Sequence, residues 1–255
     1  SPEESVVSAI PVSTFETEDN VVITTHNGMI KRSKLKDFKL SRYSKPANCM
    51  KLKEDDYVID AFIEEKRNIF TVTDSGYGLS FNMEEVPIVG VKAAGVKAMK
   101  LKDDHIVSIN QYDTNIDEFI TVLTEKGTGK RVHLTEFEQS TRARRGLLVI
   151  REVKSNPYRI LKTFITDPKN YIGIKNGNIK TLKLTELPIA DRYSTGKEIS
   201  KENLKDAFLL AVLTPREKKE KKEVVEEKIE HKKDKVSLKE IDDRLMTIDD
   251  FLNEK

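Results

Sequence analysis

The 255-residue sequence contains no tryptophan, only one cysteine and few aromatic residues. A single cysteine, Cys49, cannot form an internal disulfide or supply the several thiolates of a structural zinc site. No run of apolar residues approaches the roughly 18 that a membrane-spanning helix needs. No basic segment followed by an apolar segment marks a secretory signal at the start of the sequence. We therefore expect a reducing, cytoplasmic compartment, with Cys49 buried as a small apolar residue beside Met50.

Charged residues make up 35% of the sequence and hydrophobic residues 37%, whereas about 25% charged is usual. The excess is not uniform: residues 215–255 contain 12 Lys and Arg and 13 Asp and Glu. The remaining residues 1–214 contain 33 basic and 30 acidic side chains. That part of the chain is long enough for one all-β domain of roughly 200–250 residues.

A repeat of about fifty residues runs through residues 20–214. Four segments share an apolar strand, a glycine turn, a second strand and an acidic corner: Asn20–Phe38, Asn68–Pro87, Glu118–Phe137 and Asn170–Pro188. Their turn glycines, Gly28, Gly76, Gly127 and Gly177, are separated by 48, 51 and 50 residues. Such regularity is typical of repeat architectures and must be recognised before any local assignment.

A second pattern has the same period. The segment MKLKED at Met50–Asp55 matches MKLKDD at Met99–Asp104, displaced by 49 residues, and Gly95, Gly146 and Gly196 follow at intervals of 51 and 50. Each period holds about four strand-like segments rich in β-branched and aromatic residues. Four-stranded units at this spacing are typical of propellers.

We therefore predict an all-β, propeller-like fold with four-stranded blades at about 20–67, 68–117, 118–169 and 170–214. Residues 1–19 are interpreted as the end of an incomplete upstream blade, in which Val6–Phe15 forms the closing strand. Residues 215–236 are predicted to be a flexible charged linker. Residues 237–254 are predicted to form an amphipathic helix, because Ser237 and Glu240 make a capping box. Its apolar stripe either packs on the blades or binds a partner; the stripe comprises Leu238, Ile241, Leu245, Ile248 and Leu252.

Two stretches carry a resemblance to a known family: VITTHNGMIKRSKLKDF, and further on GYGLSFNMEEVPIVGVKAAGVKAMKLKDDHIVS. They resemble the C-terminal domain of the A subunit of bacterial type IIA DNA topoisomerases. The resemblance implies a β-pinwheel, a propeller-like ring whose blades exchange strands. It also implies sequence-tolerant binding and bending of duplex DNA, and presentation of the transported segment.

The resemblance further implies a domain that is not an enzyme by itself, with no catalytic residue and no cofactor. ATP and Mg²⁺ would be used by other domains of the parent type II topoisomerase. The expected partners are double-stranded DNA, the ATPase B subunit, and the remainder of the A subunit, in an A2B2 heterotetramer. The expected location is the bacterial cytoplasm, at the nucleoid.

The branch of the family follows from one loop. The gyrase branch carries an intact Q-R-R-G-G-K-G box, whereas residues 139–148 read QSTRARRGLL. This degenerate box resembles the topoisomerase IV branch, which decatenates and relaxes DNA. A DNA-wrapping gyrase domain and a propeller-type protein scaffold without a nucleic-acid role are the alternatives.

Basic side chains recur near the blade period, which favours binding to the phosphate backbone rather than to bases. Residues 31–53 contain nine basic side chains and one acid. The candidate DNA-binding residues are Lys31, Arg32, Lys34, Arg42, Lys45, Lys51, Lys97, Lys100, Lys126, Lys130, Arg131, Arg142, Arg144, Arg145 and Arg151. An ordinary solvated face is the competing interpretation.

Other motifs are weaker. Residues 127–131 (GTGKR) do not have the spacing of a phosphate-binding loop and fall in a hairpin turn of the repeat. The histidines His26, His105 and His133 lie in separate repeats without metal-ligand spacing, so we expect exposed turn or strand residues. Acidic pairs such as Asp103-Asp104 recur with the blades and are interpreted as turn residues.

Overall fold

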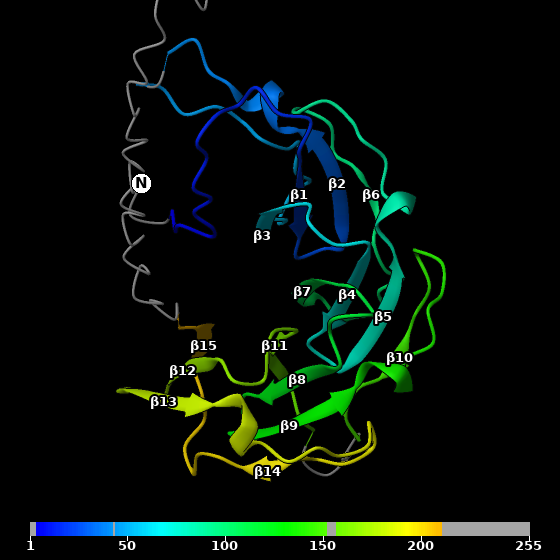
Figure 1. Ribbon diagram of the computed structural model, residues 1–255, viewed down its shortest axis with the longest axis vertical. Coiled ribbons are helices and arrows are strands. Elements are labelled where there is room, and N and C mark those ends of the chain that lie inside the picture. Colours follow the sequence, from blue (N-terminus) through cyan, green and yellow to red (C-terminus); the bar gives the residue numbers. More distant parts are fainter. Residues whose placement is uncertain (1–3, 43, 152–156, 211–255) are drawn as a thin grey trace, which may run out of the picture. The chain divides into compact units, whose positions relative to one another are not determined.

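The computed structural model describes residues 4–42, 44–151 and 157–210 (Figure 1). The chain divides into two compact units, Ser1–Val212 and Leu213–Lys255, and every described residue belongs to the first. The predicted linker at 215–236 and helix at 237–254 therefore lie outside the described residues.

The described residues form short β-strands and four 3₁₀ helices. The strands are β1 (Asn20–Thr25), β2 (Met29–Lys34), β3 (Val58–Ile63), β4 (Asn68–Thr73), β5 (Tyr77–Asn82), β6 (Val96–Lys97), β7 (Ile106–Tyr112), β8 (Phe119–Thr124), β9 (Thr128–His133), β10 (Leu147–Leu148), β11 (Ile160–Phe164), β12 (Tyr171–Lys175), β13 (Ile179–Lys183), β14 (Lys197–Glu198) and β15 (Asp206–Leu209). The helices are η1 (Leu35–Phe38), η2 (Met83–Glu85), η3 (Leu134–Glu136) and η4 (Leu184–Glu186).

Each repeat starts with an antiparallel hairpin, and the turn glycine identified from the sequence lies between its strands. The first strand of each hairpin is rich in β-branched residues, which favour extended backbone. All six residues of β4, sequence NIFTVT, are buried. Both faces of this strand are covered by neighbouring blades, so its apolar residues do not alternate with exposed polar ones.

Four sheets result, which confirms the all-β, propeller-like fold. Their strand orders are β3-β1-β2-β6, β10-β5-β4-β7, β11-β8-β9-β14 and β13-β12-β15. We call them blades 1 to 4 in chain order. Apolar clusters join consecutive blades: Val22 packs with Ile69, and Leu123 packs with Ile172.

The blades exchange strands, so the fourth strand of a blade is not in its own repeat. Strand β6 follows the hairpin of blade 2 but pairs with β2 of blade 1, with Val96 opposite Ile30. Strands β10 and β14 pair in the same way with β5 and β9 of the preceding blade. We call the segment before and through each of these strands a donor loop: residues 87–98, 138–149 and 188–199. Blade 4 contains three strands among the described residues.

A glycine with positive φ begins each donor strand. Gly95, Gly146 and Gly196 have φ values of 80°, 81° and 81°. A Cβ atom on Gly146 would lie 2.2 Å from the carbonyl oxygen of Gly78. These positions therefore require both the left-handed backbone and the absence of a side chain.

Two predictions for the N-terminal part are wrong. Residues 4–19 form no strand; Pro11 lacks an amide donor there, and Ile10, Val12 and Phe15 pack as irregular chain against blade 1. Cys49 is exposed rather than buried. Its equivalent in the next repeat, Ala98, is buried because its amide hydrogen-bonds the Gly28 carbonyl of the preceding blade.

Candidate nucleic-acid interface

Two lysines predicted to contact DNA are buried beneath the donor loops. Lys31 has 0% and Lys130 1% of its surface exposed. The Nζ atom of Lys130 donates to the carbonyl oxygens of Asp191, Arg192 and Ser194 at 2.8, 3.0 and 2.8 Å. Lys31 donates in the same way to the carbonyls of Gly90 and Val91.

Burial lowers the pKa of Lys130 to about 8, so at neutral pH the group is an ammonium with three donors, matching three acceptors. Each lysine therefore fastens the donor loop of the following repeat. The prediction that Lys31 and Lys130 bind DNA is wrong, because neither ammonium group is available to a phosphate.

Arg32 and Arg131 are also misassigned. Each is 9% exposed, and its Nε donates to a backbone carbonyl of the next corner, Val86 at 2.7 Å or Leu187 at 3.1 Å. Arg32 also forms an ion pair with Glu64 at 2.7 Å. These arginines hold the start of the donor loop.

Removing the ammonium of Lys130 should loosen one donor loop. The Lys130→Met variant keeps an unbranched side chain of similar length but leaves three backbone carbonyls without their donor. We therefore expect a loss of about 2 kcal/mol in the free energy of unfolding. Amide exchange at residues 190–196 should accelerate more than exchange elsewhere. Lys180→Met is the matched control, since Lys180 is exposed at the equivalent position; a similar loss in both variants would contradict the role of Lys130.

Arg142 and Arg145 are half-buried and stabilise the donor loop at residues 138–149, which the third repeat contributes to blade 2. Arg145 forms an ion pair with Asp104 at 2.7 Å, and its guanidinium lies 3.8 Å from the ring centroid of Tyr77. The Nη1 atom of Arg142 donates to the Lys97 carbonyl, and its amide donates to Glu85 at 2.8 Å. Charge reversal at either arginine would therefore disturb the fold as well as any bound DNA.

Asp104 is 3% exposed, and its carboxylate accepts hydrogen bonds from Ser75, the Lys102 amide and Arg145. Burial by itself raises the pKa of Asp104, but hydrogen bonds from Arg145, Ser75 and the Lys102 amide outweigh it and lower the pKa to about 2. Asp104 thus connects the turn after β6 to the donor loop of the next repeat.

The Asp104→Asn variant should lose about 2 kcal/mol of unfolding free energy at pH 7. The pKa of Asp104 in the folded state is below its ordinary value of 3.8, so the stabilisation is complete above about pH 4 and is lost as the pH falls towards 2. The difference between wild type and variant should shrink over that interval in urea titrations. Asp103→Asn is the control, because Asp103 is exposed with φ 55°, a conformation that Asn tolerates. A difference that stays constant with pH would contradict the assignment.

Exposed basic side chains lie in these donor loops or close to them in sequence. Lys97, Lys100 and Arg144 are all exposed, and the Lys100 amide donates to the Arg144 carbonyl at 2.9 Å. The sequence places Lys97 and Lys100 in one cluster and Arg144 in another. Strand exchange brings them together, since consecutive donor loops contact each other.

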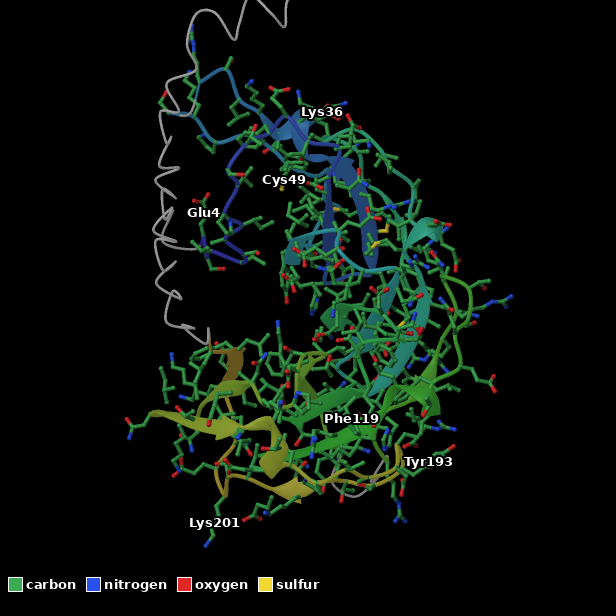
Figure 2. All side chains as sticks on the ribbon, viewed as in Figure 1. Glu4, Lys36, Cys49, Phe119, Tyr193 and Lys201 are labelled. Atoms are coloured by element: carbon green, nitrogen blue, oxygen red, sulfur yellow. The ribbon has the colours of Figure 1, made fainter. Side chains whose placement is uncertain are left out.

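One exposed basic residue recurs at the same position of every repeat, and in the second, third and fourth repeats it lies three residues after the donor strand. This basic row consists of Lys51, Lys100, Arg151 and Lys201. The intervals are 49, 51 and 50 residues, and each side chain is exposed. Figure 2 shows Lys201 extending away from the ribbon near β14. The sequence prediction omitted Lys201, although the repeat alignment contains the signal that identifies it.

The other predicted residues are scattered. Lys34 is partly exposed and pairs with Glu18 at 3.2 Å. Arg42 and Lys45 are exposed in the loop after η1. The Lys126 ammonium lies 5.4 Å from the centroid of the Tyr158 ring.

His133 ends strand β9 with a 40% exposed side chain, as expected, whereas His26 and His105 are not simple exposed turn residues. The His26 ring stacks between those of Tyr57 and His105. Its centroid lies 4.5 Å from the Tyr57 centroid and 4.1 Å from the His105 centroid. Burial lowers the pKa of His26, and the electrostatic effect of the neighbouring His105 ring lowers it further. Two consecutive blades meet at this stack, since the Ile106 amide donates to the His26 carbonyl at 3.0 Å.

Within the described ranges, no group of three or more His, Cys, Asp or Glu side chains is arranged to hold a metal ion. No helix in that part of the chain is long and apolar enough to cross a membrane.

The family model of the DNA gyrase C-terminal domain, a beta-propeller, matches residues 19–63, 67–111, 118–166 and 175–214. The chain therefore belongs to the DNA gyrase C-terminal domain family of beta-propellers. The A subunit of DNA topoisomerase 4 from Bacillus subtilis is 38% identical over 197 residues, which cover 76% of this chain and 24% of that protein. The Streptococcus pneumoniae protein of the same name is 32% identical over 235 residues, covering 83% and 28%. The chain thus spans about a quarter of the length of these relatives.

Solved structures agree with this assignment. The C-terminal domain of DNA topoisomerase IV superposes with a TM-score of 0.76 at 39% identity, covering 80% of this chain and 65% of that one. The DNA gyrase A C-terminal domain superposes with a TM-score of 0.68 at 17% identity, covering 78% and 68%, and shows the shared fold alone. The match to topoisomerase IV agrees with the degenerate box at residues 139–148.

Proposed function

We propose that the basic row, together with Lys97 and Arg144, binds the phosphate backbone of duplex DNA and bends the duplex across successive blades. The supporting observation is one exposed basic residue at the same position of all four repeats. Backbone contacts release counterions and carry no base code, so binding should be sequence-tolerant. Deformability of the DNA would set any remaining preference.

The parent protein would be an ATP-dependent type II topoisomerase of the topoisomerase IV kind. This domain would present the transported segment for decatenation and supercoil relaxation, with ATP and Mg²⁺ used elsewhere. An ATPase B subunit, together with the remainder of the A subunit, would complete an A2B2 assembly. The relatives named as A subunits of topoisomerase 4 and the missing gyrase box support this choice over a gyrase.

Binding of the isolated chain to duplexes of different sequence tests the proposal. We expect affinities that are similar among sequences and fall steeply and linearly on a logarithmic salt scale. End-to-end energy transfer across the duplex should rise on binding if the duplex bends. Absence of binding at low salt, or binding without salt dependence, would refute the proposal.

A further inference from the structure

Residues 14–19, which precede β1, carry three of the five acidic side chains found among residues 1–30, a stretch without Lys or Arg. We call them the acidic segment. Phe15, near its start, packs with the apolar cluster of blade 1. At its end, the Leu35 amide donates to the Asp19 carbonyl at 2.8 Å. The carboxylates between these two anchors are therefore held at one place on the surface of blade 1.

Three lysines at the end of the first hairpin pair with these carboxylates. Lys34 and Lys36 lie 3.2 and 3.1 Å from the two oxygens of Glu18, and Lys39 lies 2.7 Å from Glu16. Lys36 is at the top of the view in Figure 2. Hydrogen bonds from the lysines lower the pKa of both glutamates. The Glu16 and Glu18 side chains are 69% and 79% exposed, so removing the carboxylates would open the lysines to solvent.

The cation at Lys36 is not part of the repeat pattern. Lys36 is the second residue of η1. The second residues of the other three 3₁₀ helices are Glu84, Thr135 and Thr185. These helices form without a lysine at that position, so the fold does not require one there. A cation occurs only in the repeat that adjoins the acidic segment.

The two ammonium groups at Glu18 converge on a single anion. Lys34 approaches one of its oxygens and Lys36 the other. A phosphodiester also presents two oxygens that share one negative charge, and lysine binds both kinds of anion through charged hydrogen bonds. The Glu18 carboxylate therefore occupies a place that a DNA phosphate can take.

We infer that Lys34, Lys36 and Lys39 form a further binding site for DNA phosphates, which Glu16 and Glu18 occupy in this chain. The inference rests on the proposed function, because the phosphates belong to the duplex that the basic row binds. The glutamates are tethered beside the lysines, which gives them a high effective concentration. They therefore keep phosphates away from this site, and the site contributes little to affinity while they are present.

Replacing both glutamates by glutamine in the 255-residue chain tests the inference. We expect Glu16→Gln with Glu18→Gln to bind duplex DNA about 30-fold more tightly at about 0.1 M salt. The slope of log affinity against log salt should become steeper by about 1.8, because two phosphate contacts are gained at about 0.9 each. Fluorescence anisotropy at several salt concentrations measures both quantities.

Glu84→Gln with Glu125→Gln is the matched control, since both glutamates are exposed and lie in other blades. This change removes the same formal charge, and we expect affinity within about threefold of wild type and an unchanged slope. Glutamine at Lys34, Lys36 and Lys39 should abolish the gain in the Glu16→Gln, Glu18→Gln background. The same three changes should weaken binding much less in the wild-type background, where the glutamates cover the lysines.

The outcomes separate this inference from the proposed function. If the wild type and the glutamine variant both bind the duplex with one salt slope, the inference fails and the proposed function stands. An equal gain in the control pair, or an equal loss from the lysine changes in both backgrounds, would also overturn the inference. If neither chain binds the duplex at low salt, the proposed function itself fails.

Discussion

Replacing the basic row, Lys51, Lys100, Arg151 and Lys201, by alanine is expected to lower duplex affinity on the order of 1000-fold at about 0.1 M salt. Each phosphate contact contributes about 0.9 to the slope of log affinity against log salt, so the slope should become shallower by about 3.6. All four side chains are exposed, so the variant should unfold at the same temperature as wild type. Titration by fluorescence anisotropy at several salt concentrations measures both quantities.

Four exposed lysines away from the row provide the control: Lys36, Lys169, Lys175 and Lys205. Their replacement removes the same formal charge but, on our proposal, no phosphate contact. We expect a salt slope close to wild type. An equal loss in both quadruple variants would mean that only net charge matters, and would contradict a defined binding row.

The Gly146→Ala variant is expected to lose about 3 kcal/mol of unfolding free energy, which makes it the most damaging single substitution considered. Gly146 has φ 81°, and an added Cβ would lie 2.2 Å from the Gly78 carbonyl oxygen and 3.1 Å from the Leu79 Cβ. Both contacted atoms belong to strand β5, which cannot give way as a flexible side chain could. The donor strand must therefore move away from β5. Urea unfolding with amide exchange at residues 140–149 measures the global and local effects.

Gly90→Ala is the matched substitution in another donor loop. No heavy atom lies within 4 Å of the added Cβ, and its φ is not positive. We expect a change within about 0.5 kcal/mol. If both variants were equally stable, strand exchange at Gly146 would not require glycine.

Local sequence patterns predicted much of this protein correctly. The spacing of Gly28, Gly76, Gly127 and Gly177 identified four hairpins, and β-branched runs identified their strands. The propeller-like class followed, because repeated hairpins with apolar faces must cover one another. Each hairpin lies within about twenty residues, where local periodicity is readable, and its recurrence at about fifty residues is readable from the sequence as well.

The assignment of basic residues was less successful because burial depends on distant segments. Lys31, Lys130 and Lys180 occupy equivalent places in their repeats, yet the first two are buried and the third is exposed. The difference is the donor loop, which arrives from about sixty residues later in the chain: Lys130 binds the Ser194 carbonyl. No local sequence pattern around these lysines predicts whether a donor loop will cover them.

Cys49 illustrates the same limit. Its surroundings resemble those of Ala98, so burial was the natural expectation. Ala98 is buried by the turn of the preceding blade, through the Gly28 carbonyl, and the described part of the chain provides no equivalent turn for Cys49.

The amino-acid sequence by itself determined the period, the hairpins, the all-β class and the family. Only the tertiary structure decided which cations fasten donor loops and which form an exposed row. The physical reason is that strand exchange pairs segments far apart in the chain, and desolvation of a lysine or arginine depends on what that exchange places above it. Some of the abundant charged residues are therefore structural. Lys31 and Lys130 are buried beneath the donor loops, where they take the place of apolar packing.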